Sequence, residues 1–110
     1  ACSSHELIDS LEQAHALGYD MVCLITHPFE FISRDSFRFD NMRPNRTNQR
    51  RLQQLCQYLK THSDRFNVTT FSQIDPQQVP IRNEDRQPLR GSYLAMLKRT
   101  AENYYTDHLC

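Results

Sequence analysis

The order of its apolar patterns predicts an α/β fold for this chain. Two short segments, parallel strands near 21–26 and 67–72, are apolar or rich in β-branched and aromatic residues, as strands are. Helices near 4–17, 48–62 and 92–105 are predicted from apolar residues at helical spacing. Strand, helix and strand in succession make a parallel crossover unit. Two strands alone do not make a stable parallel sheet, so we expect terminal β/α units of a larger fold, or pairing with another chain.

The composition allows one small domain with a thin core. The chain has 110 residues, of which 38% are hydrophobic, and we divide it into an α/β part over residues 1–75, a polar arm with prolines over residues 76–91, and a C-terminal helix and tail over residues 92–110. Basic and acidic residues number 13 each, so bulk charge disfavours nucleic acid as a partner. The chain does not begin with Met, which indicates a processed, trimmed or partial chain.

The first helix has a signal at each end. Ser3 and Glu6 have the spacing of a capping box, in which each side chain satisfies a backbone N–H of the other residue. Gly18 stands where a left-handed residue ends a helix. The apolar stripe between them consists of Leu7, Ile8, Leu11, Ala14 and Leu17.

His27 follows a continuous apolar run over residues 21–25, which is typical of a strand buried on both faces. This run is too short for a transmembrane segment, which needs about 20 apolar residues. Pro28 ends the strand because proline cannot donate to a sheet. Ligands of α/β folds bind beyond the carboxyl ends of strands, and histidine titrates near neutral pH. His27 is therefore a candidate general acid or base, with a loop-closing histidine as the alternative.

Glu30 is a candidate substrate-binding residue in a segment, residues 29–51, that is rich in phenylalanine and arginine. Its carboxylate could orient the imidazole of His27 or bind a substrate hydroxyl. The alternative is a solvated carboxylate in a loop. A loop of this length in a small domain is usually functional or disordered, and its phenylalanines argue against disorder.

Arg43, Arg46 and Asn48 are further candidates for substrate binding, because they lead into the second helix. Helix N-termini attract anions, and arginine binds carboxylate or phosphate with two parallel hydrogen bonds. Ion pairs with nearby acidic residues are the alternative. Thr47 or Asn48 is the expected N-cap of this helix. Arg51 lies within the helix, where a solvated face is expected.

The cysteines and histidines of this chain do not have the spacing of a metal site, since neither C-x-x-C nor H-x-x-x-H occurs. Cys23 and Cys56 fall on predicted apolar faces, where free thiols are usually buried. Buried free thiols, and the lack of a visible signal peptide, favour the cytoplasm. Asn45 and Asn67 begin N-x-T triplets, which are acceptor sequences for N-glycosylation. They argue against the cytoplasm only if the protein is secreted.

The run over residues 22–27, followed by Pro28, Phe29 and Glu30, resembles the last conserved segment of NodB-type polysaccharide deacetylases. In that family a strand near the C-terminus ends in a hydrophobic-x-His signature, and Ile25 stands where the family often has Leu. The likeness extends over roughly residues 2–75 and includes the helices on either side of the strand. Residues 76–110 resemble no family that we can name.

The resemblance implies a distorted (β/α) barrel and the removal of N- or O-acetyl groups from a carbohydrate substrate. It also implies a divalent metal, usually zinc, which would be held by one Asp and two His from an early segment that this chain lacks. His27 would protonate the leaving group, and the remainder of the parent polypeptide would complete the sheet. The alternative function is a non-catalytic α/β binding or interaction domain that uses the loop over residues 29–51.

Overall fold

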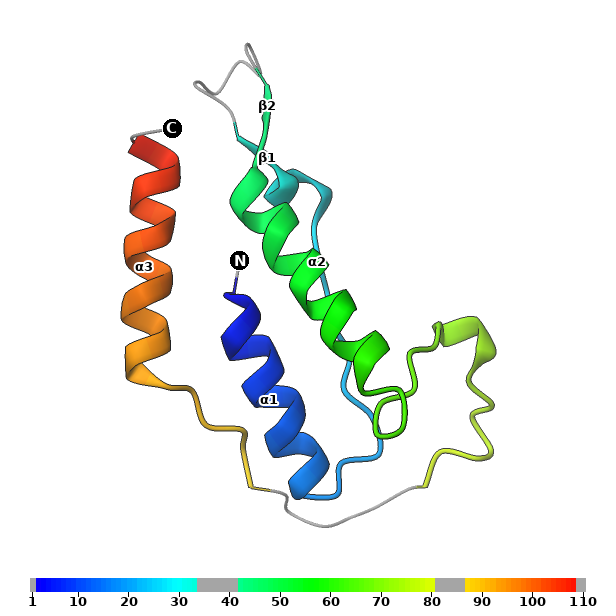
Figure 1. Cartoon of the computed structure of the whole chain (residues 1–110). Coiled ribbons are helices and arrows are strands. Elements are labelled where there is room, and N and C mark those ends of the chain that lie inside the picture. The colour runs from blue at the N-terminus through cyan, green and yellow to red at the C-terminus, as the bar shows by residue number, and fades with distance from the viewer. Residues whose placement is uncertain (1, 34–41, 81–86, 109–110) are drawn as a thin grey trace.

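Three α-helices are the main elements of the described structure, and extended segments and short turns connect them (Figure 1). The computed structural model describes residues 2–33, 42–80 and 87–108. The helices are α1 (Ser4–Ala16), α2 (Arg46–Thr61) and α3 (Tyr93–His108). All three lie where the sequence predicts helices, and their ends differ from the predicted ends by at most three residues.

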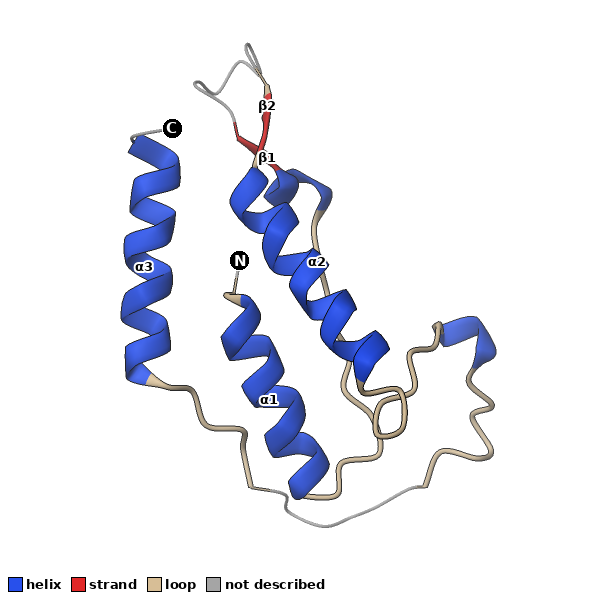
Figure 2. Cartoon of the chain, in the orientation of Figure 1, coloured by secondary structure: helices blue, strands red, loops and turns tan. Residues whose placement is uncertain are grey.

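A small antiparallel hairpin is the only sheet among the described residues (Figure 2). Its strands are β1 (Ile32–Ser33) and β2 (Arg43–Pro44), with Ile32 opposite Pro44. Two 3-10 turns complete the elements, η1 (Pro28–Phe31) before the hairpin and η2 (Phe71–Gln73) after α2.

The predicted parallel strands are wrong, and so is the distorted (β/α) barrel that the resemblance implied. Residues 21–26 are extended, but they pair with no strand in the described structure, and the side chain of Ile25 is 75% exposed. In the segment near 67–72, the Thr70 backbone N–H donates a hydrogen bond to Gln73 Oε1 at 3.1 Å, and the chain turns into η2. Strand propensity sets an extended backbone, but a sheet also needs a neighbouring strand about 4.8 Å away.

The capping box of α1 is confirmed. The Ser3 hydroxyl accepts a hydrogen bond from the Glu6 backbone N–H at 3.3 Å, and the Ser3 backbone N–H donates to Glu6 Oε2 at 2.8 Å. Gly18 follows the helix with φ +69°, as expected for a residue that reverses the chain. Because both ends are fixed by local contacts, α1 presents a defined face to α2.

The packed core is small and lies between α1 and α2. Ala14 of α1 and Leu55 of α2 are the buried hydrophobic residues of the described structure, each 2% exposed. Asn45, rather than the predicted Thr47 or Asn48, is the N-cap of α2, and its side chain accepts from the Asn48 backbone N–H at 3.0 Å. The helix therefore begins earlier than predicted and follows directly after β2.

The chain returns from the far end of α1 to α3 along an arm that contacts α1. Gln13 and Arg90 exchange two hydrogen bonds of 2.8 Å, through the Gln13 amide and the Arg90 backbone. The Tyr19 hydroxyl also donates to the Gln87 carbonyl at 2.8 Å. These contacts bring α3 beside α1 and α2 (Figure 1).

Candidate functional site

His27 lies at the exposed end of the extended segment, where η1 begins. Its carbonyl accepts a hydrogen bond from the Glu30 backbone N–H at 3.0 Å, which closes the turn. The imidazole stacks on the ring of Phe29, with centroids 5.0 Å apart and planes 8° from parallel. Pro28 fixes the first φ angle of the turn. The direction of the imidazole is therefore set by a short, locally determined turn.

Glu30 contributes its backbone to this arrangement. Its carbonyl accepts a hydrogen bond from Asn48 Nδ2 at 2.7 Å. Among the described residues, no contact joins the Glu30 carboxylate to the imidazole of His27, so the predicted orienting role is not seen in this structure.

Asn48 joins η1 to the first turn of α2. Its Nδ2 donates to the Glu30 carbonyl, and its Oδ1 accepts from Arg51 Nη1 at 2.9 Å. A second hydrogen bond also joins η1 to the start of α2, from the Asn45 backbone N–H to the Phe31 carbonyl at 2.8 Å. The loop that begins at His27 is thus held against the N-terminus of α2 at two points.

Arg43 and Arg46 lie near this junction. Arg43, in β2, lines an open hollow of about 490 Å³ that begins directly after His27. The full lining is Pro28, Phe31, Ile32, Met42, Arg43, Pro44 and Gln49. Arg46 is the first residue of α2 and is exposed, but it does not line the hollow. The structure therefore places one of the two arginines beside a largely apolar surface next to His27.

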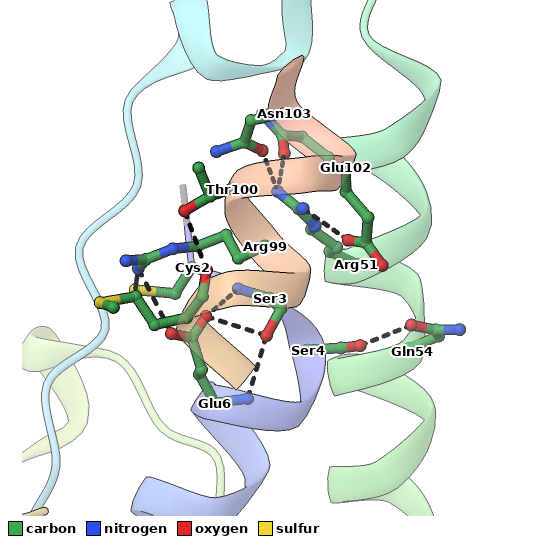
Figure 3. A network of polar contacts seen from close by, with 12 residues as sticks. Cys2, Ser3, Ser4, Glu6, Arg51, Gln54, Arg99, Thr100, Glu102 and Asn103 are labelled. Atoms are coloured by element: carbon green, nitrogen blue, oxygen red, sulfur yellow. Dashed lines mark hydrogen bonds and ion pairs between the residues drawn. The ribbon is translucent and has the colours of Figure 1, made fainter. Parts of the chain in front are cut away.

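Arg51 is a residue of this site that sequence reasoning missed. Its side chain is 6% exposed, so the predicted solvated face is wrong at this position. Arg51 Nη2 donates to Glu102 Oε2 at 2.7 Å, and Nη1 donates to Asn103 Oδ1 at 3.0 Å (Figure 3). Nη1 also donates to Asn48 Oδ1. Its Nε is buried and has no hydrogen-bond partner among the described residues. No local signal in the sequence marks this burial, because the partners Glu102 and Asn103 lie far along the chain.

A second polar cluster holds α3 against the start of α1. Arg99 Nη1 lies 3.4 Å from Glu6 Oε1, on the carboxylate that caps α1 (Figure 3). Burial by itself raises the pKa of Glu6. The hydrogen bonds from the Ser3 backbone and hydroxyl, together with the charges of Arg99 and Arg51, outweigh burial and lower that pKa below its ordinary value.

The free thiols are exposed, which corrects the expectation of buried cysteines. Cys2, Cys23 and Cys56 are all exposed and unpaired with one another. The packed core is too small to reach them. Their exposure removes the support that buried thiols gave to a reducing compartment.

No metal site can be built from the part of the chain that the structure describes, because no three His, Cys, Asp or Glu side chains lie together there. The described helices also include none that is long and apolar enough to cross a membrane. Comparisons with protein family models, with curated proteins and with solved structures gave no match.

Proposed function

We propose that this chain is the C-terminal part of a polysaccharide deacetylase-like hydrolase, which removes acetyl groups from a carbohydrate. In this proposal His27 is the general acid that protonates the leaving group. The support is the resemblance of residues 22–30 to the family's last conserved segment, together with the exposed position of His27 at the end of that segment.

The observation that carries the proposal is the way in which the imidazole of His27 is held. Phe29 covers one face of the ring, which leaves the ring edge with its two nitrogens directed away from the stack. Neither nitrogen forms a hydrogen bond to a described residue. A general acid must reach the leaving-group atom with its N–H, so a ring held by one face and accessible at its edge suits this role.

The surroundings of His27 offer contacts for a carbohydrate. The hollow that begins at Pro28 has apolar walls and the guanidinium of Arg43 at its side. Apolar surfaces pack against sugar rings, and arginine binds carboxylate or hydroxyl oxygens. We assign substrate binding to Arg43, and a supporting role to the exposed Arg46 at the start of α2.

Glu30 and Asn48 stay predicted substrate-binding residues, but their observed contacts are with the protein. Asn48 already uses Nδ2 and Oδ1 in hydrogen bonds to Glu30 and Arg51. An amide can make further hydrogen bonds through its second N–H and its second lone pair. Asn48 could therefore contact substrate and still keep its hydrogen bonds to Glu30 and Arg51.

The divalent metal that the resemblance implies does not fit the described residues, which bring no three suitable ligands together. We assign the metal, usually zinc, and its Asp and His ligands to the remainder of the parent polypeptide. The role proposed for this chain is limited to proton donation by His27 and to the surface around it.

The test is acetate release by the protein as its source makes it, with an N-acetylglucosamine oligomer and an O-acetylated xylan oligomer as probes. His27→Ala should lower kcat by about 10²- to 10⁴-fold, the usual contribution of general acid catalysis. His5→Ala is the control, because His5 is an exposed histidine on α1 away from η1. Acetate release at the wild-type rate by His27→Ala, or none by the wild type, would contradict the proposal.

A second candidate function, an interaction domain, is favoured by the exposed apolar side chains of the extended segment. Met21, Val22, Leu24 and Ile25 are between 44% and 75% exposed, which is unusual for consecutive apolar residues. Sedimentation of the isolated chain tests self-association through this segment. A monomer at all concentrations, with a thermal unfolding midpoint independent of concentration, would argue against association with a second copy.

A further inference from the structure

We propose that α3 positions the turn beside His27, and that Arg51 and Asn48 transmit this effect. Arg51 and Asn48 are then positioning residues for the general acid. The inference rests on the proposed function, because the direction of the His27 ring matters for turnover only if His27 donates a proton.

The first step is the contact between α3 and Arg51. Glu102 Oε2 and Asn103 Oδ1 accept hydrogen bonds from Arg51 Nη2 and Nη1 at 2.7 and 3.0 Å. The guanidinium is a planar group with donors in a fixed arrangement, so two partners on one helix fix its plane. With only 6% of its side chain exposed, Arg51 has little freedom to adopt another rotamer.

The second step is the orientation of the Asn48 amide. Arg51 only donates hydrogen bonds, so it must face Oδ1 of Asn48, which it does at 2.9 Å. Nδ2 is then directed to the other side, where the carbonyl of Glu30 accepts its hydrogen bond at 2.7 Å. Asparagine suits this position because it accepts from one neighbour and donates to the other.

The third step leads from Glu30 to the imidazole. Glu30 belongs to η1, and its backbone N–H closes the turn on the His27 carbonyl at 3.0 Å. Phe29, on which the imidazole stacks, lies between them in the same turn. A shift of η1 away from α2 therefore moves the ring of Phe29 and, with it, the imidazole.

A second ion pair, which lies away from η1, allows the positioning of η1 to be distinguished from general stabilisation of the fold. This pair, between Arg65 and Glu12, has the same N–O distance of 2.7 Å, and Glu12 is as exposed as Glu102, at 36% against 37%. The Glu12 pair joins α1 to the segment after α2 and does not contact η1. Glu12→Ala is therefore a control that matches Glu102→Ala in the exposure of the carboxylate, while its partner Arg65 is 32% exposed and Arg51 is 6% exposed.

The experiment uses the protein as its source makes it and has two readouts, amide hydrogen exchange and acetate release. Glu102→Ala should speed exchange in residues 28–33 by about fivefold or more, because local opening of η1 becomes easier. The same variant should lower kcat by about tenfold and leave KM within twofold, since misplacement of a catalytic group affects turnover. Glu102→Gln, which keeps an acceptor for Arg51, should restore most of the lost turnover.

Asn48→Asp separates the contact between Arg51 and residue 48 from the contact between residue 48 and the Glu30 carbonyl. The carboxylate keeps its contact with Arg51 but has no N–H for the Glu30 carbonyl. We expect exchange in residues 28–33 to speed up while α3 stays protected. This variant also carries the test if Glu102→Ala fails to fold, because it leaves the Arg51–Glu102 pair in place.

Wild-type exchange in residues 28–33 of Asn48→Asp would overturn the proposal, as would faster exchange without loss of kcat. An equal effect of Glu12→Ala on residues 28–33 would also overturn it, because the effect would then be general destabilisation. If the wild type releases no acetate, the proposed function fails. The exchange readout still decides whether α3 holds the turn.

Discussion

Ser3 and Glu6 cap α1 reciprocally, and the same Glu6 carboxylate also faces Arg99 of α3 at 3.4 Å. One ionised side chain thus stabilises a helix start and the contact between two helices. Each of these interactions favours the charged carboxylate, since a protonated carboxyl loses its attraction for the guanidinium and accepts hydrogen bonds more weakly. The attachment of α3 to α1 therefore depends on the ionisation of Glu6.

The first prediction concerns pH. The pKa of Glu6 is lower in the folded chain than its ordinary value of 4.5, which we take for the unfolded chain. The stabilisation is therefore fully present above about pH 4.5 and is lost as the pH falls through the folded pKa. Thermal unfolding of the wild type between pH 7 and pH 3 should show this loss, and Glu6→Gln should have a lower midpoint at pH 7 and a weaker dependence below pH 4.5. An identical pH dependence in Glu6→Gln would show that other carboxylates dominate.

The second prediction concerns the core. Leu55 is 2% exposed, so Leu55→Ala should lower the free energy of unfolding by about 2–4 kcal/mol through lost burial and the remaining cavity. Leu94, on α3, is 79% exposed, and Leu94→Ala should change that free energy by less than about 0.5 kcal/mol. Urea unfolding of both variants makes the comparison. A loss of more than about 1 kcal/mol in Leu94→Ala would mean that α3 is covered in solution.

The helices could be predicted because their signals are local. The Ser3–Glu6 cap and Gly18 fix α1 from residues close in the sequence, and apolar residues at helical spacing mark α2 and α3. Strand pairing is not local. An extended backbone near Ile25 and Val68 follows from residue type, but whether a neighbouring strand lies beside it depends on the rest of the chain. The predicted strands were therefore wrong, and part of the second one, from Phe71, is the 3-10 turn η2.

In the candidate site, too, local features could be predicted and contacts with distant residues could not. His27, Glu30 and Asn48 come together because the hairpin brings η1 back to the N-terminus of α2, and these residues were predicted from a single stretch of sequence. Arg51 was not found, because its burial depends on Glu102 and Asn103, which lie some fifty residues further along the chain. No local pattern distinguishes a solvated arginine on a helix from one that a distant helix covers.

The third prediction uses the two glycines of the chain as a matched pair. Gly18 has φ +69°, which strains any residue with a Cβ, although a Cβ there would meet no atom within 4 Å. Gly18→Ala should therefore destabilise the chain by about 1 kcal/mol through backbone strain alone. A Cβ on Gly91 also meets nothing within 4 Å, and its φ lies outside the left-handed range. Gly91→Ala should be neutral or stabilise the fold by up to about 1 kcal/mol, because alanine restricts the unfolded chain.

Thermal or urea unfolding of the two alanine variants, measured side by side, tests this pair. Equal midpoints would mean that the chain leaves α1 without the left-handed residue at Gly18. The route from α1 into the segment that ends at His27 would then differ from the one described. The expected ordering, Gly18→Ala below the wild type and Gly91→Ala at or above it, would instead place the reversal at Gly18. The direction in which residues 21–27 leave α1 is therefore tied to one backbone angle.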